Sequence, residues 1–143
     1  MQAGKKNKAI VFGVFDGLHD GHRFFLAEAK TKAEYLIAVV APDEAVFKLK
    51  GRQPIFSLEE RMDILKREKL SNMVIAGDEE PGVWSAIAKL RPDIIVLGYD
   101  QKDLQDALLE WTKWQTWPIE IIFVSSHSPE TLHSRFILKE KAR

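Results

Sequence analysis

Apolar and polar positions alternate along this chain in blocks that predict strands and helices in turn. Short runs of consecutive apolar residues are typical of strands buried on both faces, and stretches with helical periodicity follow them. The predicted strands are residues 9–15, 35–41, 72–76, 93–98 and 119–124. The predicted helices are residues 21–34, 58–70, 83–90 and 104–111, with a last helix from Pro129 onward. This alternation predicts an α/β protein whose parallel sheet is covered by helices on both faces.

Capping residues set some of these boundaries. Ser57 and Glu60 have the spacing of a capping box, in which each side chain binds the other residue's backbone N–H at the start of a helix. Ser128 and Pro129 suit the cap and the first position of the last helix. The polar stretch over residues 42–56 has no clear period, so we expect it to be irregular.

Composition narrows the classes of protein that fit. The chain of 143 residues is expected to form one domain, residues 1–143, with a polar tail over residues 1–8. Its 21 basic and 21 acidic residues cancel, which disfavours a general nucleic-acid binder. Without cysteine it can form neither disulfides nor a thiolate zinc site. The apolar runs are too short for a membrane span, and the start lacks the apolar core of a signal peptide. We therefore expect a cytoplasmic protein with no membrane or nucleic-acid partner.

The most informative segment is Gly-Val-Phe-Asp-Gly-Leu-His-Asp-Gly-His, residues 13–22. It joins the first predicted strand to the first predicted helix. Its glycines allow a tight turn, and Gly21 would leave the N–H groups of the helix N-terminus open to an anion. His19 and His22 can each donate a hydrogen bond to a phosphate oxygen, and negative charge would favour their protonated forms. The segment predicts a triphosphate site; the alternative is a plain turn with two surface histidines.

Other polar segments are expected at the same edge of the sheet. Residues 42–50, 98–101 and 124–128 also follow predicted strands. Ligands of parallel sheets bind at the carboxyl ends of the strands, near the point where strand order reverses. The four segments would therefore surround one ligand site.

Residues 13–22 resemble the signature G-x-F-D-x-x-H-x-G-H of the cytidylyltransferase-like nucleotidyltransferase superfamily. This superfamily includes glycerol-3-phosphate cytidylyltransferases and the adenylyltransferases that make FAD, coenzyme A precursors and NAD. The resemblance implies a Rossmann-like doubly wound sheet of five parallel strands. It also implies that His19 and His22 contact the nucleotide phosphates and stabilise the transition state. The other signature residues expected to bind the nucleotide are Gly13, Val14, Phe15, Asp16 and Gly21. Asp16 is expected to anchor the turn rather than to bind metal.

Basic residues after the second predicted strand are the next candidates. Similar enzymes carry one or two lysines here, and a mobile positive charge would stabilise the departing pyrophosphate. Lys48 is predicted to be catalytic and Lys50 to bind the nucleotide; the alternative for both is an ordinary charged loop. Arg61 matches an arginine that similar enzymes often carry. It is expected near the acceptor, or else as a plain charge on the helix surface.

Gly98 and Asp100 follow the fourth predicted strand and resemble the nucleotide-base loop of the family. The glycine would let a planar base lie against the backbone, and the carboxylate would hold a base amino group or a ribose hydroxyl. The Gly-Tyr-Asp-Gln sequence is more similar to archaeal-type FAD synthases than to glycerol-phosphate cytidylyltransferases, which favours adenine. Asp100 could also cap the following helix.

The segment before the last predicted helix departs from the family pattern. Similar enzymes carry R-T-x-G-I-S-T-[ST], or a shorter version, whose hydroxyls bind the outer phosphates. Aligning residues 132–135 with the end of that pattern leaves Ser134 as the matching hydroxyl, and it is predicted to contact phosphate. His133 and Arg135 stand where small polar residues are usual, and Ser128 replaces the arginine.

Together these residues favour a nucleotidyltransferase, in which a small phosphorylated acceptor attacks the α-phosphorus of ATP or CTP and pyrophosphate leaves. Mg²⁺ would accompany the triphosphate, and no metal-binding residues of the protein are predicted. Adenylation of FMN to FAD is the favoured reaction, and cytidylation of glycerol 3-phosphate or a similar polyol phosphate is the alternative. A nucleotide-binding protein without catalysis is a further alternative, motivated by the altered final motif. A dinucleotide-binding dehydrogenase is disfavoured because the first turn lacks G-x-G-x-x-G.

Three tryptophans crowd the end of the helix predicted at 104–111 and the residues after it: Trp111, Trp114 and Trp117. Core packing is the favoured interpretation, with Trp111 on the inward face of that helix. The alternative is an exposed patch through which two copies of the chain form a homodimer.

Overall fold

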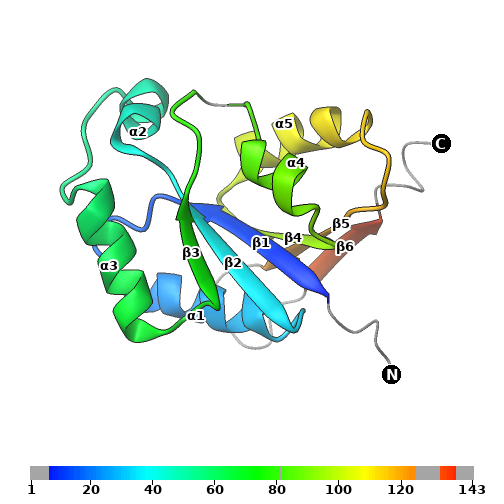
Figure 1. Ribbon diagram of the computed structural model, residues 1–143, viewed down its shortest axis with the longest axis horizontal. Helices are drawn as coiled ribbons and strands as arrows, with labels where there is room; N and C mark the ends of the chain where they lie inside the picture. The colour runs from blue at the N-terminus through cyan, green and yellow to red at the C-terminus, as the bar shows by residue number, and fades with distance from the viewer. Residues whose placement is uncertain (1–6, 81, 125–132, 138–143) are drawn as a thin grey trace.

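The computed structural model describes residues 7–80, 82–124 and 133–137, the last segment by its backbone alone. The strands form one sheet in the order β3-β2-β1-β4-β5-β6 (Figure 1). The first five strands in chain order pair in parallel, and β6 runs antiparallel to β5. The five parallel strands confirm the Rossmann-like fold expected from the sequence. The strands are β1 (Lys8–Gly13), β2 (Tyr35–Val40), β3 (Met73–Ala76), β4 (Ile94–Gly98), β5 (Glu120–Val124) and β6 (His133–Ile137).

Helices cover both faces of this sheet, as Figure 1 shows. Helices α1 and α3 pack on one face, and α4 and α5 pack on the other. The capping box of Ser57 and Glu60 is present at the start of α3, as the sequence predicts. The helices are α1 (Asp20–Lys30), α2 (Asp43–Lys50), α3 (Leu58–Glu68), α4 (Ser85–Leu90) and α5 (Lys102–Thr112).

The central strands are buried on both faces, which explains their uninterrupted apolar sequences. Successive residues of β1 point to opposite sides of the sheet. Val11 joins the core beneath α1 and α3, where Leu26 and Leu65 are fully buried. Ile10 joins the core beneath α4 and α5, where Ile87 is fully buried. Because full burial of one such side chain contributes about 1.5–3 kcal/mol, the two cores hold the carboxyl edge of the sheet in a fixed geometry.

The segment after β2, expected to be irregular, contains helix α2. Pro42 precedes the helix in an extended conformation, with φ −64° and ψ 160°. Gly51 ends it in the left-handed region, with φ 76°, and its N–H donates to the carbonyl of Phe47. The expectation was wrong because only Ala45 and Val46 of this short helix are buried, so its apolar periodicity is weak. Its terminal signals, a preceding proline and a following glycine, are present in the sequence.

Residues 133–137 form strand β6, so the expectation of a helix over these residues was wrong. The backbone of β6 pairs along the whole of β5, from His133 opposite Val124 to Ile137 opposite Glu120. Ser128 and Pro129, which carried the helix signal, lie outside the described residues. Pairing with an open sheet edge depends on the rest of the fold and not on local propensity, which is why the sequence pattern missed it.

The strand order reverses between β1 and β4. From β1 the chain moves outward to β2 and β3, and then returns to place β4 on the other side of β1. The crevice beyond the carboxyl ends of strands at such a reversal is where open α/β sheets bind ligands. Residues 13–22 follow β1 and residues 98–101 follow β4, so the fold brings both segments to this crevice.

Candidate active site

The signature turn leaves β1 with the ring of Phe15 folded back over Gly13. Phe15 is buried and has a φ of 52°, in the left-handed region. A Cβ atom placed on Gly13 would lie 2.7 Å from two ring carbons of Phe15. The Gly13 carbonyl accepts from the N–H of Ala41, which follows β2. Gly13 and Phe15 therefore shape the turn by packing, and their contact with a nucleotide stays a prediction.

The two signature histidines cap the N-terminus of α1. The N–H of Gly21 donates to Nδ1 of His19 over 3.0 Å, and the N–H of His19 donates to Nδ1 of His22 over 3.2 Å. The rings stack with their centroids 3.8 Å apart. Gly21 is needed because a Cβ there would lie 2.9 Å from the His19 ring. In the free protein the Gly21 N–H is engaged by the His19 ring, and its contact with a nucleotide stays a prediction.

This capping fixes how the histidines can meet a ligand. Because each Nδ1 accepts a hydrogen bond, the hydrogen-bond pattern assigns the proton of each neutral ring to Nε2. Adding a proton at Nδ1 would break the cap. His19 and His22 are thus held as a pair of Nε2–H donors, an arrangement suited to phosphate oxygens.

His22 is partly buried beside His19, Phe15 and Asp100. Burial disfavours the charged ring and lowers the pKa of His22 below its usual 6.5, and the charges of His19 and Arg23 act in the same direction. The carboxylate of Asp100 opposes them. The neutral ring of His22 is therefore favoured in the free protein, and protonation of the ring beside bound phosphate stays a prediction.

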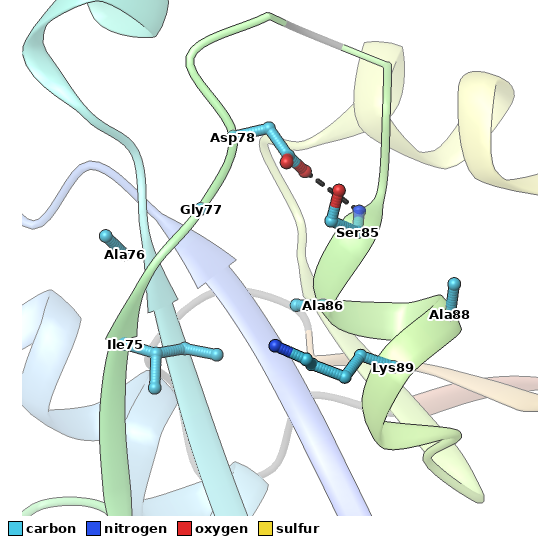
Figure 2. Close-up of a pocket in the computed structure, with 8 residues that line it drawn as sticks. All are labelled: Ile75, Ala76, Gly77, Asp78, Ser85, Ala86, Ala88 and Lys89. Carbon is cyan, nitrogen blue, oxygen red and sulfur yellow. Dashed lines mark hydrogen bonds between the residues drawn. The ribbon is translucent and has the colours of Figure 1, made fainter.

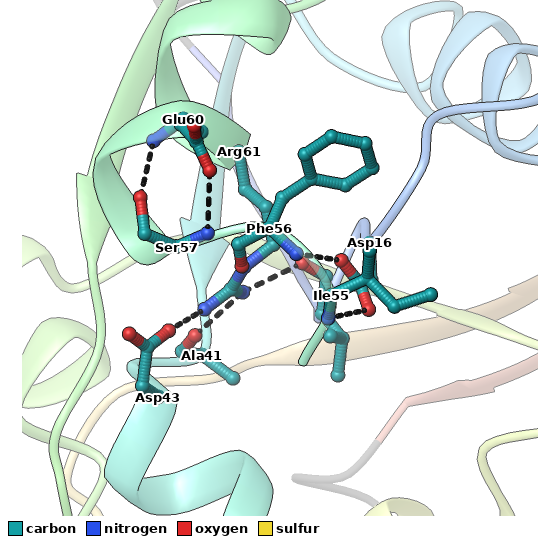
Figure 3. Close-up of polar contacts among 9 residues, drawn as sticks. Asp16, Ala41, Asp43, Ile55, Phe56, Ser57, Glu60 and Arg61 are labelled. Atoms are coloured by element: carbon teal, nitrogen blue, oxygen red, sulfur yellow. Dashed lines mark hydrogen bonds and ion pairs between the residues drawn. The ribbon is translucent and has the colours of Figure 1, made fainter. Parts of the chain in front are cut away.

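Asp16 joins the signature turn to the segment before α3. Its two carboxylate oxygens accept from the backbone N–H groups of Ile55 and Phe56 over 2.8 and 2.9 Å (Figure 3). Burial raises the pKa of Asp16, but these two hydrogen bonds and the charges of Arg61 and Arg52 outweigh it, and the net shift is downward. Asp16 thus anchors a distant segment onto the turn. Its contact with a nucleotide stays a prediction.

Arg61 is buried, with 1% of its surface exposed, which rules out a plain surface charge. Its guanidinium donates to the carbonyls of Val14, Ala41 and Phe56 over 2.8–2.9 Å. It also pairs with Asp43 of α2 over 2.6 Å (Figure 3). One side chain therefore joins the signature turn, the end of β2, helix α2 and the segment before α3. Sequence reasoning missed this structural role, and a role toward the acceptor stays a prediction.

Lys48 lies in the last turn of α2 and reaches across to the segment between β3 and α4. Its ammonium group contacts Glu80 over 2.7 Å. This contact is the largest cause of the raised pKa of Lys48, which keeps the side chain charged. Lys50 is exposed at the end of the same helix. Both lysines therefore stand on a helix rather than on a loop, and a ligand would have to draw Lys48 away from Glu80.

The segment after β4 closes the other side of the crevice. Gln101 accepts from the N–H of Gly98 over 2.7 Å and donates to the carbonyl of Phe12 over 2.9 Å. It thereby links the ends of β4 and β1, a role that sequence reasoning missed. Gln101 is also the residue preceding α5, which has no side-chain cap, so the alternative of Asp100 as that helix's cap was wrong. Asp100 instead lies close enough to influence the pKa of His22.

Ser134 lies in β6, opposite Phe123 near the carboxyl end of β5. Its side chain lies outside the described part of the structure, so its contact with phosphate stays a prediction. The fold thus brings together the signature turn, Asp100 and the helix that carries Lys48. It uses Arg61 to hold those segments in place.

The fold and the paired histidines define a Rossmann-like nucleotidyltransferase. The family model described as cytidylyltransferase-like matches residues 10–141. The chain therefore belongs to the cytidylyltransferase-like family.

Relatives with assigned names support this membership. The chain is 39% identical over 122 residues to an FAD synthase of Thermococcus sibiricus, covering 85% of this chain and 82% of the relative. It is 45% identical over 103 residues to an FAD synthase of Pyrococcus abyssi, covering 71% and 68%. Among solved structures, a lipopolysaccharide core biosynthesis protein of Thermoplasma volcanium superposes with a TM-score of 0.71 at 32% identity. That match covers 85% of this chain and 98% of the other.

Within the described residues, no group of three or more histidine, cysteine, aspartate or glutamate side chains is placed to hold a metal ion. No helix in the described part of the chain is long and apolar enough to cross a membrane.

Proposed function

We propose that this protein is an FAD synthase, which transfers the adenylyl group of ATP to FMN and releases pyrophosphate. The observation that carries the proposal is the pair of histidines held as Nε2–H donors at the strand-order reversal. Support comes from the relatives named FAD synthase at 39–45% identity. The Gly98–Gln101 segment beside the crevice is consistent with an adenine nucleotide.

The reaction needs positioning and charge stabilisation more than a protein nucleophile. An oxygen of the FMN phosphate attacks the α-phosphorus of ATP in line. A new P–O bond forms while the bond between the α-phosphorus and the bridging β-oxygen breaks, and the electron pair leaves with pyrophosphate. The acceptor oxygen is already anionic, so no general base is required.

Each site residue has a part in this proposal. His19 and His22 donate from Nε2 to the phosphate oxygens whose charge grows in the transition state. Lys48, released from Glu80, and Lys50 meet the departing pyrophosphate. Ser134 contributes a hydroxyl to the outer phosphates.

The remaining residues form the walls of the site. Gly98 and Asp100 border the base and ribose. The signature residues provide the floor of the phosphate site: Gly13, Val14, Phe15, Asp16 and Gly21. Arg61 acts on the acceptor side through the segments that it joins, because its own guanidinium is already engaged by three carbonyls and Asp43.

Mg²⁺ fits this site as an ion carried by the triphosphate. Both carboxylate oxygens of Asp16 are occupied by backbone N–H groups, whereas the carboxylate of Asp100 lies close enough to His22 to influence its pKa. Mg²⁺ is commonly held by substrate phosphates, water and one or two carboxylates. When bound, it neutralises phosphate charge.

We also propose that two copies of the chain associate through the end of α5. Trp114 there is 78% exposed, an unusual position for an indole ring. Trp111 and Trp117 instead pack against the core, and Trp117 donates from its indole N–H to the carbonyl of Pro92. Sedimentation of the wild type and of Trp114→Ser tests the association, which a monomeric wild type would contradict.

The function is tested by incubating the purified protein with Mg²⁺ and matched pairs of substrates. We expect FAD and pyrophosphate from ATP with FMN, and no product from CTP with glycerol 3-phosphate. Product from the second pair alone would replace the proposal with a cytidylyltransferase. Nucleotide binding without pyrophosphate release from either pair would support a binding protein without catalysis.

A further inference from the structure

A pocket of about 470 Å³ opens between β3 and α4, away from the paired histidines (Figure 2). One wall is formed by residues 75–78 and the other by α4 side chains. This volume lies within the roughly 300–1,000 Å³ typical of small-molecule sites. The pocket has no part in the function derived so far.

The lining combines apolar surface with charged and polar side chains, which include Asp78 and Ser85 as well as Lys89. Ile75 lies on the β3 side, and the small residues Ala86 and Ala88 of α4 leave room against it. The ammonium group of Lys89 is directed across the pocket toward β3 (Figure 2). Among the described residues Lys89 has no hydrogen-bond or ion-pair partner. Such a lining suits a flat, largely apolar ring whose polar edge both accepts and donates hydrogen bonds, because the pocket offers the ammonium group of Lys89 and the carboxylate of Asp78.

The walls of the pocket connect directly to the signature turn. The ring of Trp84, the residue before α4, packs edge-on against Phe12 with the centroids 5.4 Å apart. Phe12 immediately precedes Gly13 of the turn. On the other side, the N–H of Gly77 donates to the carbonyl of Val40 at the end of β2. The pocket is therefore held at a fixed distance from the site of chemistry.

That distance follows from the strand order. β3 lies two strands from β1, and neighbouring strands are about 4.8 Å apart, so the β3 wall of the pocket stands roughly 10 Å to the side of β1, the strand that leads into the signature turn. The ribityl chain of FMN separates its phosphate from its ring by a similar length. His19 and His22 lie at α1, on the other face of the sheet from α4, so one molecule would reach both positions by passing over the carboxyl edge of the sheet.

We propose that the pocket between β3 and α4 binds the isoalloxazine ring of FMN and that Lys89 is a specificity-determining residue for it. The apolar benzenoid part of the ring lies against Ile75 and the α4 alanines. Lys89 donates to a carbonyl oxygen on the pyrimidine edge, where flavin electron density is highest. This assignment rests on the proposed function.

The test measures FMN affinity by quenching of flavin fluorescence, and the Michaelis constants for FMN and ATP by FAD formation. Two variants act on the pocket in different ways: Lys89→Ala removes the cation, and Ala86→Trp fills the space from the side of α4 that faces β3 (Figure 2). Lys66→Ala is the matched control, because Lys66 is an exposed lysine on α3, outside the pocket. Circular dichroism melting verifies that each variant is folded.

We expect Lys89→Ala to weaken FMN binding and to raise the KM for FMN about tenfold, as for the loss of one charge-assisted hydrogen bond. Ala86→Trp should weaken FMN binding at least as much. The KM for ATP should stay unchanged in both, and Lys66→Ala should match the wild type. If the wild type forms FAD while both pocket variants keep its FMN affinity, the pocket assignment fails alone. If the wild type neither binds FMN nor forms FAD, the proposed function fails with it.

Discussion

The two sides of the signature turn are stabilised in different ways. On the α1 side, His19 and His22 are held by hydrogen bonds within four consecutive residues. On the α3 side, Asp16 and Arg61 hold the turn through partners that are 18 to 47 positions away in the chain. In the proposed function the first side presents donors to a ligand, whereas the second side uses its hydrogen bonds within the protein. The comparison separates residues positioned for chemistry from residues that position them.

Substitution of His19 should give the largest effect, a decrease in kcat. Removing one preorganised donor from a transition state typically costs about 10²–10³-fold in kcat. His19→Asn retains a side-chain acceptor for the helix N-terminus but lacks the Nε2–H, so it should lose this rate while melting like the wild type. His19→Ala should lose the rate and also about 1 kcal/mol of stability with the cap.

Steady-state kinetics and urea unfolding of the two His19 variants make this comparison. Near-normal turnover in His19→Asn would show that the ring serves the helix cap and not the ligand.

Substitution of Arg61 should mainly lower the stability of the fold. Arg61→Met would leave three carbonyls without their donor in a buried setting, so we expect a loss of about 3 kcal/mol or more in the free energy of unfolding. Arg67→Met, at an exposed position on the same helix, should change it by less than about 0.5 kcal/mol. Urea unfolding at neutral pH measures both. Equal stabilities for the two variants would mean that the joined segments are held by other contacts.

Changing Asp16 should have an intermediate effect that depends on pH. The folded-state pKa of Asp16 lies below its ordinary value of 3.8, so ionised Asp16 stabilises the fold above that value. The contribution is lost as the pH falls through the lower folded pKa. Asp16→Asn keeps one acceptor oxygen and should cost about 1–2 kcal/mol at pH 7. The gap between variant and wild type should shrink below pH 3.8, as measured by urea unfolding across pH. A gap independent of pH would assign the effect to packing.

Changing Lys48 or Glu80 should have the smallest effect on the fold. Their ion pair is exposed, and such pairs contribute little to stability. Both Lys48→Ala and Glu80→Gln should therefore melt like the wild type. Lys48→Ala should slow turnover by about tenfold or more if its charge meets the pyrophosphate, whereas Glu80→Gln should not, because it leaves the lysine free. Equal rates in both variants and the wild type would make the pair a surface contact.

The comparison of the two sides also explains how far the sequence could be interpreted. The strands and the histidine cap depend on residues close together in the chain, so periodicity and spacing reveal them. The buried position of Arg61 depends on carbonyls from three other segments, which no local pattern contains. The same holds for Gln101, whose partners in β4 and β1 come together only when the sheet forms.

Two elements show how a local sequence pattern can mislead: one helix was not expected, and another was expected where the structure has a strand. Helix α2 carries a preceding proline and a following glycine, and these terminal signals outweigh its weak apolar period. The helix signal at Ser128 and Pro129 did not extend over residues 133–137, because that backbone pairs with β5. Short elements are thus best predicted from their ends, and edge strands require knowledge of the whole sheet.

The side-chain amide of Gln101 makes the crevice more rigid than the paired strands alone would. Described pairing between β1 and β4 ends at Val11 and Val96, so the last residues of both strands lie beyond the ladder. The side-chain amide of Gln101 accepts from the N–H of Gly98 and donates to the carbonyl of Phe12. It thereby links the ends of β4 and β1 where no described backbone hydrogen bonds of the ladder do so. A nucleotide bound in the crevice would then contact strand ends that are already ordered, and little conformational entropy of these residues would be lost on binding.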